Sequence, residues 1–332
     1  MTIQRKGLPN LAAIVRRRFE NPAPFLNETE DEVATRLGRP IVRQLTKKDS
    51  APGGYQALRM SSIGGCARQL AYRLLGEAQD GRKMTGRTVA TFAMGDITES
   101  LLLTGLDDGM AQGHGPDGWK VAGLRQVTGQ HNVSLTVRLD GLRMPIKING
   151  HPDGILTKDG KPVAVVEVKS TSSYGYTKAE QAIKNGGDAW TPVDGQWWQA
   201  QSYMEATGLQ WLSVLMLCKD SGAFMSWWIE RDPEFMNMLR KHLGRVIMGE
   251  DVKDVPRITA GNEELKPSQP EYYRRSGKGY TKGQQKRGSG ALPWRCCYCE
   301  FYRTCWGGHL DERVESDRFG SPSTKLYFKE LI

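Results

Sequence analysis

The chain has 332 residues, 39% of them hydrophobic and 25% charged, which is typical of a folded globular protein and excludes a disordered one. Its 46 Lys and Arg against 37 Asp and Glu give a formal net charge of +9, which favours a polyanionic partner. There is no apolar signal core after Met1 and no run of roughly 18 apolar residues that could span a membrane. We therefore expect a cytoplasmic protein that does not bind membranes and whose six cysteines are reduced thiols or metal ligands.

Residues 1–60 are expected to form a basic N-terminal arm. The arginine triplet Arg16–Arg18 precedes a segment with two prolines, Asn21–Pro24, which predicts a short helix followed by extended chain. Such a triplet is usually a solvated helix face, and contact with DNA is the alternative.

A helix is predicted after Ser61 or Ser62, with one of the two serines as its cap and Gly76 as its end. Cys66 lies on its apolar face and, taken alone, indicates a small buried side chain. A longer helix is predicted over residues 87–106, where Gly95 and Glu99 share one face. Residues 107–129 are rich in Gly and Asp and are expected to be loop.

Strands are predicted over 133–137 and 145–149, leading into a hairpin that folds back at Asp159-Gly160 to form one antiparallel meander. The second hairpin strand ends in Glu167 and Lys169, which project from the same face because they are two residues apart. A two-residue turn would place Asp153 and Glu167 on opposite faces. We expect a three-residue loop with a glycine bulge, which pairs Asp153 directly with Glu167.

Two carboxylates that converge at a strand end can hold a hard divalent cation, with a lysine ammonium beside it. Asp153 and Glu167 are the candidate ligands, and Glu99 is a candidate third carboxylate. His151 shares the face of Asp153 and is expected to act as a hydrogen-bond partner near the site. The alternatives are an ordinary surface Glu–Lys pair at Glu167 and Lys169 and a solvent-facing helix residue at Glu99.

The next helix is predicted over residues 194–207, where Gln199 and Tyr203 are four apart and lie on one face. Gln196 is the competing glutamine, seven residues from Tyr203. Strands over 211–218 and 224–229 and a helix over 233–248 follow. Most of the tryptophans of this region are expected to pack in the core, namely Trp197, Trp198, Trp227 and Trp228.

A basic, glycine-rich segment without acidic residues precedes the C-terminal cysteines. It is expected to be a flexible loop that contacts DNA phosphates, with a solubilising linker as the alternative. Its cations are Arg274, Arg275, Lys278, Lys282, Lys286 and Arg287.

Three cysteines near the C-terminus have metal-ligand spacing. Cys296 and Cys299 form a C-x-x-C pair, a spacing that lets two thiolates hold one metal centre, and Cys305 follows. Three ligands are one short of the usual four.

Pro152-Asp153 with Glu167-Val168-Lys169 resembles the signature of the PD-(D/E)xK nuclease superfamily. Gln199-x-x-x-Tyr203 after that strand is similar to its RecB-like branch. The resemblance implies an α/β core with a mixed sheet flanked by helices. It implies that the metal, Mg²⁺ or Mn²⁺, is bound by Asp153, Glu167, Glu99 and the Val168 carbonyl, that Lys169 orients the attacking water, and that Gln199 and Tyr203 position the substrate. The branch often has histidine where this chain has Glu99.

Cys66 together with the late C-x-x-C-x5-C resembles the CRISPR-associated iron–sulfur exonucleases and their AddB and phage relatives. The resemblance implies a 4Fe–4S cluster held by Cys66, Cys296, Cys299 and Cys305 that clasps the N- and C-terminal segments of the nuclease. Structural zinc is the alternative metal, and Cys297 is the alternative to Cys296 as ligand.

The implied activity is that of a metal-dependent DNA exonuclease on single-stranded DNA or DNA ends, in phage or bacterial recombination and repair. Its nuclease core would span residues 61–250 and its iron–sulfur segment residues 251–332. A recombination or annealing protein would be a further partner. The alternatives are a structure-specific endonuclease and a DNA-binding recombination partner without catalytic activity.

Overall fold

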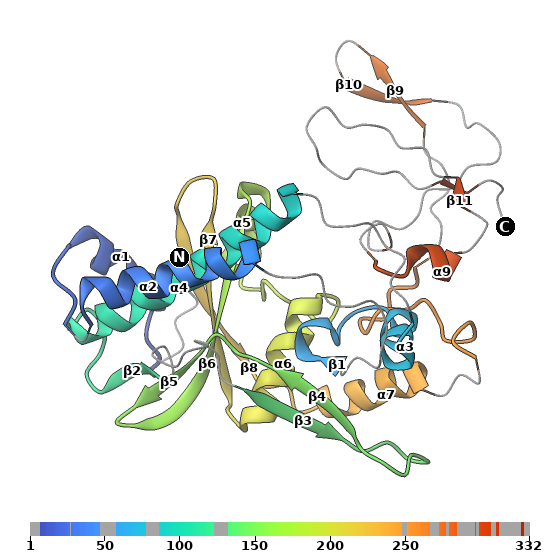
Figure 1. Ribbon diagram of the computed structural model, residues 1–332, viewed down its shortest axis with the longest axis horizontal. Helices are drawn as coiled ribbons and strands as arrows, with labels where there is room; N and C mark the ends of the chain where they lie inside the picture. The colour runs from blue at the N-terminus through green and yellow to red at the C-terminus, as the bar shows by residue number, and fades with distance from the viewer. Residues whose placement is uncertain are drawn as a thin grey trace. The chain divides into compact units, whose positions relative to one another are not determined.

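The computed structural model describes residues 7–26, 28–46, 58–77, 86–122, 132–247, 251–265, 272–276, 279–283, 296, 299–306, 310–311 and 327–328. The chain divides into two compact units (Figure 1). One comprises Met1–Ser50, Ala57–Gly64 and Thr88–Arg240, and the other comprises Ala51–Gln56, Gly65–Arg87 and Lys241–Ile332. We call the first the sheet unit and the second the cysteine unit. No described helix is both long and apolar enough to cross a membrane.

The sheet unit is built on a five-stranded mixed sheet of order β2-β5-β6-β7-β8 (Figure 1). β6 and β7 run parallel, and the other neighbouring strands are antiparallel. This confirms the predicted α/β class with a mixed sheet. The strands are β2 (Trp119–Ala122), β5 (Gly154–Lys158), β6 (Lys161–Thr171), β7 (Trp211–Cys218) and β8 (Phe224–Glu230).

Helices contact both faces of this sheet. α1 (Leu11–Glu20) and the C-terminal half of α4 (Gly86–Ala111) share one apolar core with Ala164, Val166 and Val168 of β6. α5 (Ser173–Lys184) and α6 (Gly195–Thr207) contact β6 and β7. Val165 and Glu167 alternate along β6 with Ala164, Val166 and Val168, so their side chains lie on the opposite face of the sheet. Burial on both faces explains why β6 is a continuous apolar run without alternation.

The β5–β6 hairpin has the predicted register but reaches it in a different way. Its connection is the two-residue turn Asp159-Gly160, where both residues have positive φ, 50° and 78°, as a type I′ turn requires. A register shift lies further along, where Leu156 pairs with Ala164 but Thr157 pairs with Pro162. The predicted three-residue loop is therefore wrong, and the extra residue is Val163, bulged within β6.

A second, three-stranded sheet has the order β1-β4-β3. The prediction of one meander is wrong, because the strands over 133–137 and 146–150 exist but belong to this sheet. One side of it packs against α6, since a Cβ added at Gly150 would lie 2.7 Å from Cε1 of Tyr203. Its other side is exposed along β3. The strands are β1 (Leu58–Arg59), β3 (Val133–Val137) and β4 (Ile146–Gly150), and the 3-10 helix η1 (Met60–Ser62) follows β1.

The helices and strands from α6 to α7 follow their predictions. α6 begins after Asp194 and ends at Gly208, whose φ of 69° is left-handed. β7, β8 and α7 (Phe235–Ile247) match the expected ranges to within two residues. The four tryptophans are between 0% and 6% exposed, which confirms their place in the core. α5 was not predicted, and β2 lies in the region expected to be loop, into which α4 also extends as far as Ala111.

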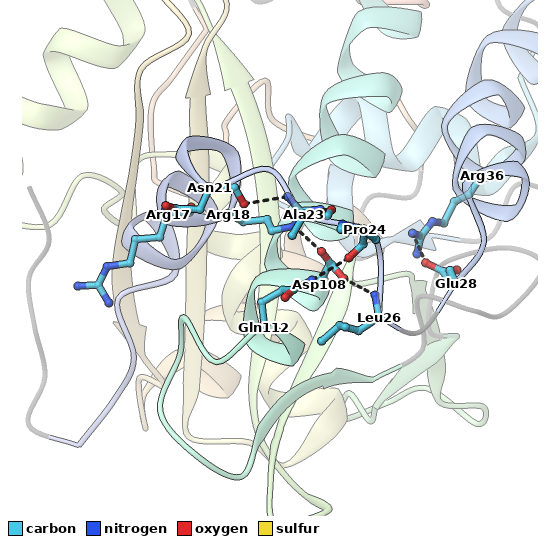
Figure 2. Close-up of polar contacts among 10 residues, drawn as sticks. All are labelled: Arg17, Arg18, Asn21, Ala23, Pro24, Leu26, Glu28, Arg36, Asp108 and Gln112. Carbon is cyan, nitrogen blue, oxygen red and sulfur yellow. Dashed lines mark hydrogen bonds and ion pairs between the residues drawn. The ribbon is translucent and has the colours of Figure 1, made fainter.

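The N-terminal segment is fastened to α4 by a buried ion pair (Figure 2). Arg18 Nε donates to Asp108 Oδ2, and Arg18 Nη2 donates to the Ala23 carbonyl at 2.8 Å. Asp108 Oδ1 accepts from the Leu26 N–H at 3.2 Å. This confirms the predicted short helix, α1, although its apolar face lies in the core and Arg18 is buried, so the arginine triplet is not entirely a solvated face. α2 (Glu30–Thr46) was not predicted, because extended chain was expected after α1.

We expect Asp108→Ala to lower the free energy of unfolding by about 3 to 5 kcal/mol, because it leaves the buried Arg18 guanidinium without its partner. Glu180→Ala is the matched control, since it removes the exposed ion pair with Lys184 on α5 and should cost about 0.5 kcal/mol. Urea unfolding of both variants measures the difference. Equal losses would show that the Arg18–Asp108 pair contributes no more than a surface pair.

The cysteine unit contains α3 (Ala67–Leu75), which ends at Gly76 with a φ of 70° as predicted. Its N-cap is Cys66, so the expected serine cap is wrong. Glu300 accepts hydrogen bonds from Gln69 and Arg73, and ties α3 to the C-terminal cysteine segment. The remaining elements are β9 (Tyr272–Ser276), β10 (Gly279–Gly283), α9 (Tyr302–Trp306), β11 (Leu310–Asp311) and β12 (Tyr327–Phe328).

Candidate active site

Asp153 and Glu167 converge beside the start of β5. Gly154 pairs with Val166, so continuing that register by one residue places Asp153 opposite Glu167. Both are buried, at 7% and 1% exposure. Asp153 Oδ2 accepts the Val168 N–H at 2.7 Å, which fixes the carboxylate against β6. The structure thus brings together the two carboxylates that the sequence pairs.

The carboxylates of the site repel one another. Burial, and then the negative charges of Glu167 and Glu99, raise the pKa of Asp153 well above its ordinary value. Glu99, on α4, is therefore close enough to act electrostatically on Asp153. A positive charge among these residues would relieve the repulsion, because it would stabilise the ionised carboxylates.

Lys169 supplies one such charge. Its Nζ donates to Glu167 Oε1, on the same face of β6. Burial acts to lower the pKa of Lys169, but the charges of Glu167 and Asp153 outweigh it, and the pKa is raised. Lys169 is therefore held as an ammonium beside the carboxylates, where it can stabilise negative charge on a bound group.

α6 is tied to the same carboxylate by a chain of hydrogen bonds. Gln199 Nε2 donates to Glu167 Oε1 and to the Tyr203 hydroxyl, each at 2.9 Å. The hydroxyl donates to the His151 carbonyl at 3.0 Å. The contact of His151 is thus made by its backbone, and its side chain is exposed. Gln196 is exposed, which favours Gln199 as the glutamine of the site.

Tyr203 is only 3% exposed, and burial followed by the charge of Glu167 raises its pKa. A neutral, enclosed phenol holds α6 and the β4–β5 connection together and cannot stack on a substrate base. Its effect on a substrate would pass through Gln199 and His151. The sequence spacing placed Tyr203 on the correct helix face but could not indicate this enclosure.

The residues fit a hard divalent cation. Glu167 Oε2 is buried and has no hydrogen-bond partner among the described residues, which is costly unless a cation or donor meets it. The available donors are oxygens, the type that Mg²⁺ and Mn²⁺ prefer. Among the described residues, no three His, Cys, Asp or Glu side chains form a preformed metal group. Glu167 Oε1 is instead engaged by Lys169 and Gln199.

The four cysteines singled out in the sequence lie in one apolar cluster of the cysteine unit. Cys296 packs with Leu265 and Trp306, and Cys66, Cys299 and Cys305 pack against them. Burial raises the pKa of Cys66 and of Cys299, and the charges of other cysteines in the cluster contribute. The Cys66 and Cys299 thiols are therefore costly to ionise, and a metal cation bound beside them would offset that cost. Cys297 lies outside the described residues.

Arg257 belongs to this cluster and was not predicted. Its Nε donates to Cys305 Sγ at 3.3 Å, and its Nη2 donates to the Cys305 carbonyl at 2.7 Å. The guanidinium lies over the Trp306 ring, 3.8 Å from the centroid. Arg257 therefore fixes Cys305 and Trp306 relative to each other. No local pattern around Arg257 indicates this role, because its partners lie about 50 residues further along the chain.

The basic segment is only partly described. Arg274, Arg275 and Lys282 lie on the antiparallel strands β9 and β10, where Arg274 pairs with Thr281. These strands replace the loop expected there. Lys278, Lys286 and Arg287 lie outside the described residues.

No protein-family profile and no curated protein matches the sequence. Among solved structures, the chain is similar to SSO0001, with a TM-score of 0.37 and 14% identity; the match covers 66% of this chain and 86% of that one. It is also similar to an alkaline exonuclease from Laribacter hongkongensis, with a TM-score of 0.30, 17% identity and coverage of 66% and 91%. The same exonuclease in complex with dAMP gives a TM-score of 0.31, 16% identity and the same coverage. Similarity at this level decides nothing about the reaction, so the functional conclusion rests on the site residues.

Proposed function

We propose that the protein is a metal-dependent deoxyribonuclease that hydrolyses phosphodiester bonds as an exonuclease on single-stranded DNA or DNA ends. The observation that carries the proposal is the meeting of Asp153, Glu167 and Lys169 at one end of the β5–β6 hairpin. Burying two carboxylates beside an ammonium carries a desolvation cost that lowers the stability of the fold. Chemistry on a phosphodiester accounts for all three groups.

Each residue then has a distinct role. Asp153, Glu167, Glu99 and the Val168 carbonyl would hold Mg²⁺ or Mn²⁺, which supplies an activated water and charge stabilisation when bound. Lys169 orients the attacking water and stabilises negative charge on the phosphate. Gln199 holds Glu167 in place through its amide. Arg274, Arg275, Lys278, Lys282, Lys286 and Arg287 would contact the DNA backbone outside the site.

The cysteine cluster is proposed to hold a 4Fe–4S cluster as a structural clasp, with zinc as the alternative metal. Cys66, Cys296, Cys299 and Cys305 would be the ligands, and Cys297 is the alternative to Cys296. The support is that all four pack in one apolar cluster although Cys66 lies 230 residues before Cys296. A metal centre held by these cysteines would link the segment at Cys66 to the segment from Cys296 to Cys305.

The decisive test of the activity compares linear with circular single-stranded DNA of one sequence, with Mg²⁺ and with chelator. We expect Mg²⁺-dependent loss of the linear strand alone. Cleavage of both forms would indicate an endonuclease instead. Binding without cleavage under either Mg²⁺ or Mn²⁺ would indicate a DNA-binding recombination partner, and would overturn the nuclease proposal.

A further inference from the structure

The solvent-facing side of the β1-β4-β3 sheet carries positive charge that the proposed reaction does not use. Along β3 and β4 the side chains alternate between buried and exposed, so one side of the sheet is a continuous exposed surface. Arg59, Lys147 and Arg138 are exposed and belong to this surface or its edge. We call these three residues and the polar ones between them the sheet surface.

The register places these residues in adjacent rows. Arg59 pairs with Asn149 on β4, and Asn149 pairs with Ser134 on β3. In the next row Lys147 pairs with Thr136. Arg138 follows two residues after Thr136 and so continues the same face. Rows on one strand are about 7 Å apart, which presents the cations as a stripe along the sheet.

The stripe has little negative charge beside it. Asp140, in the loop between β3 and β4, is the sole acidic residue in the sequence from 132 to 151, whereas Arg143 in that loop adds a further exposed cation. Arg59, Arg138 and Lys147 form no ion pair with another described residue. Between the cations, Ser134 Oγ donates to Asn149 Oδ1 at 3.1 Å, and the Asn149 amide nitrogen and the Thr136 hydroxyl add further hydrogen-bonding groups. Exposed cations alternating with neutral hydrogen-bonding groups suit a phosphate backbone.

A short segment of chain connects the sheet surface to the candidate active site. β4 ends at Gly150 and continues through His151 into Asp153, so Lys147 lies at most about 20 Å from Asp153 along the chain. The opposite side of the sheet packs on α6 at Gly150 and Tyr203. Since α6 also carries Gln199, the surface and the site are held by the same helix.

We infer that the sheet surface binds the backbone of the DNA strand on which the site acts, outside the nucleotides at the metal. The inference rests on the proposed function for the identity of the polyanion. Its ligand is single-stranded DNA, recognised by phosphate charge and not by base sequence. None of its residues belongs to the basic segment of residues 274–287.

The test measures binding of a single-stranded oligonucleotide by fluorescence anisotropy over a series of salt concentrations, in full-length protein carrying Glu167→Gln to prevent cleavage. Each phosphate contact on a single strand contributes about 0.7 to the slope of log affinity against log salt. The triple variant Arg59→Gln, Arg138→Gln, Lys147→Gln should therefore reduce the slope by about 2. Lys147→Gln alone should reduce it by about 0.7 and serves if the triple variant unfolds.

The matched control is Lys120→Gln, Lys158→Gln, Lys161→Gln, which removes the same charge from exposed positions of β2 and the turn end of the β5–β6 hairpin. Its slope should equal that of the parent protein. Equal reductions in both triple variants, or none in the first, would overturn the sheet surface. Binding is measured without cleavage, so the two proposals can fail separately. If the first triple variant reduces the salt slope but the unmodified protein does not cleave DNA, the nuclease proposal alone is wrong. Cleavage by the unmodified protein with an unchanged slope in the first triple variant would remove the surface alone.

Discussion

Glu167→Gln is expected to slow DNA cleavage about a thousandfold, because loss of one carboxylate ligand removes on the order of 4 kcal/mol of stabilisation from the transition state. The substitution keeps the shape of the side chain, so neighbouring residues in the core of β6 are not disturbed. Steady-state rates with Mg²⁺ on linear single-stranded DNA give the measurement. Glu180→Gln, at a partly exposed position of α5, is the control for the loss of a carboxylate as such.

The same variant should change the unfolding temperature little, because two effects oppose each other. Asp153 has a raised pKa because burial and the charge of Glu167 oppose its ionisation, and removing that charge relieves the repulsion. The substitution also takes the ion-pair partner from Lys169, although this ammonium keeps the charge of Asp153 beside it. Lys169→Met has no such compensation. It leaves the Glu167 carboxylate, 1% exposed, without its ammonium partner, and should lower the unfolding temperature as well as the rate. Cleavage near the unmodified rate in either variant would remove these residues from the active site.

Cys305→Ser is expected to abolish iron binding and to lower the stability of the cysteine unit by up to about 5 kcal/mol, the entropy of closing a loop of some 240 residues. Protein purified without oxygen should be brown and contain iron and sulfide, and the variant should be colourless. Metal analysis, visible absorption and thermal unfolding together measure the effect.

Cys218→Ser is the matched control for that experiment. Cys218 is also a free cysteine, but it lies on β7 in the sheet unit, is 2% exposed and does not belong to the cysteine cluster. It should keep its iron and colour. One equivalent of zinc without iron would replace the iron–sulfur cluster by a structural zinc site, and equal loss of metal from both variants would show that the cluster ligands are wrongly assigned.

Much of the fold was predictable because its signals are local. Alternation and apolar runs gave the strands, and Gly76 and Gly208 marked helix ends through their left-handed conformation. The spacing of Glu167 and Lys169 placed them on one face, and their contact follows directly from the period of a strand.

What could not be predicted depends on contacts between distant segments. β3 and β4 belong to a second sheet, which packs on α6. The sequences of the two strands do not indicate this packing. Arg257 contacts Cys305 only after the cysteine unit has folded. The side chain of His151 was expected at the site, but the backbone carbonyl makes the contact, and every residue carries a carbonyl.

The bulge at Val163 has a consequence for which length changes this hairpin can accept. Side chains in a strand repeat with period two, so the single inserted residue reverses the parity between the turn and the strand ends. A change in the length of the turn alone leaves the pairing in place, because loops of two to five residues can join the same two strands. Within β6, by contrast, the loss of one residue between the turn and Glu167 keeps Glu167 opposite Asp153 only if the bulge is lost with it. Homologous hairpins with one residue fewer in this strand should therefore lack the bulge.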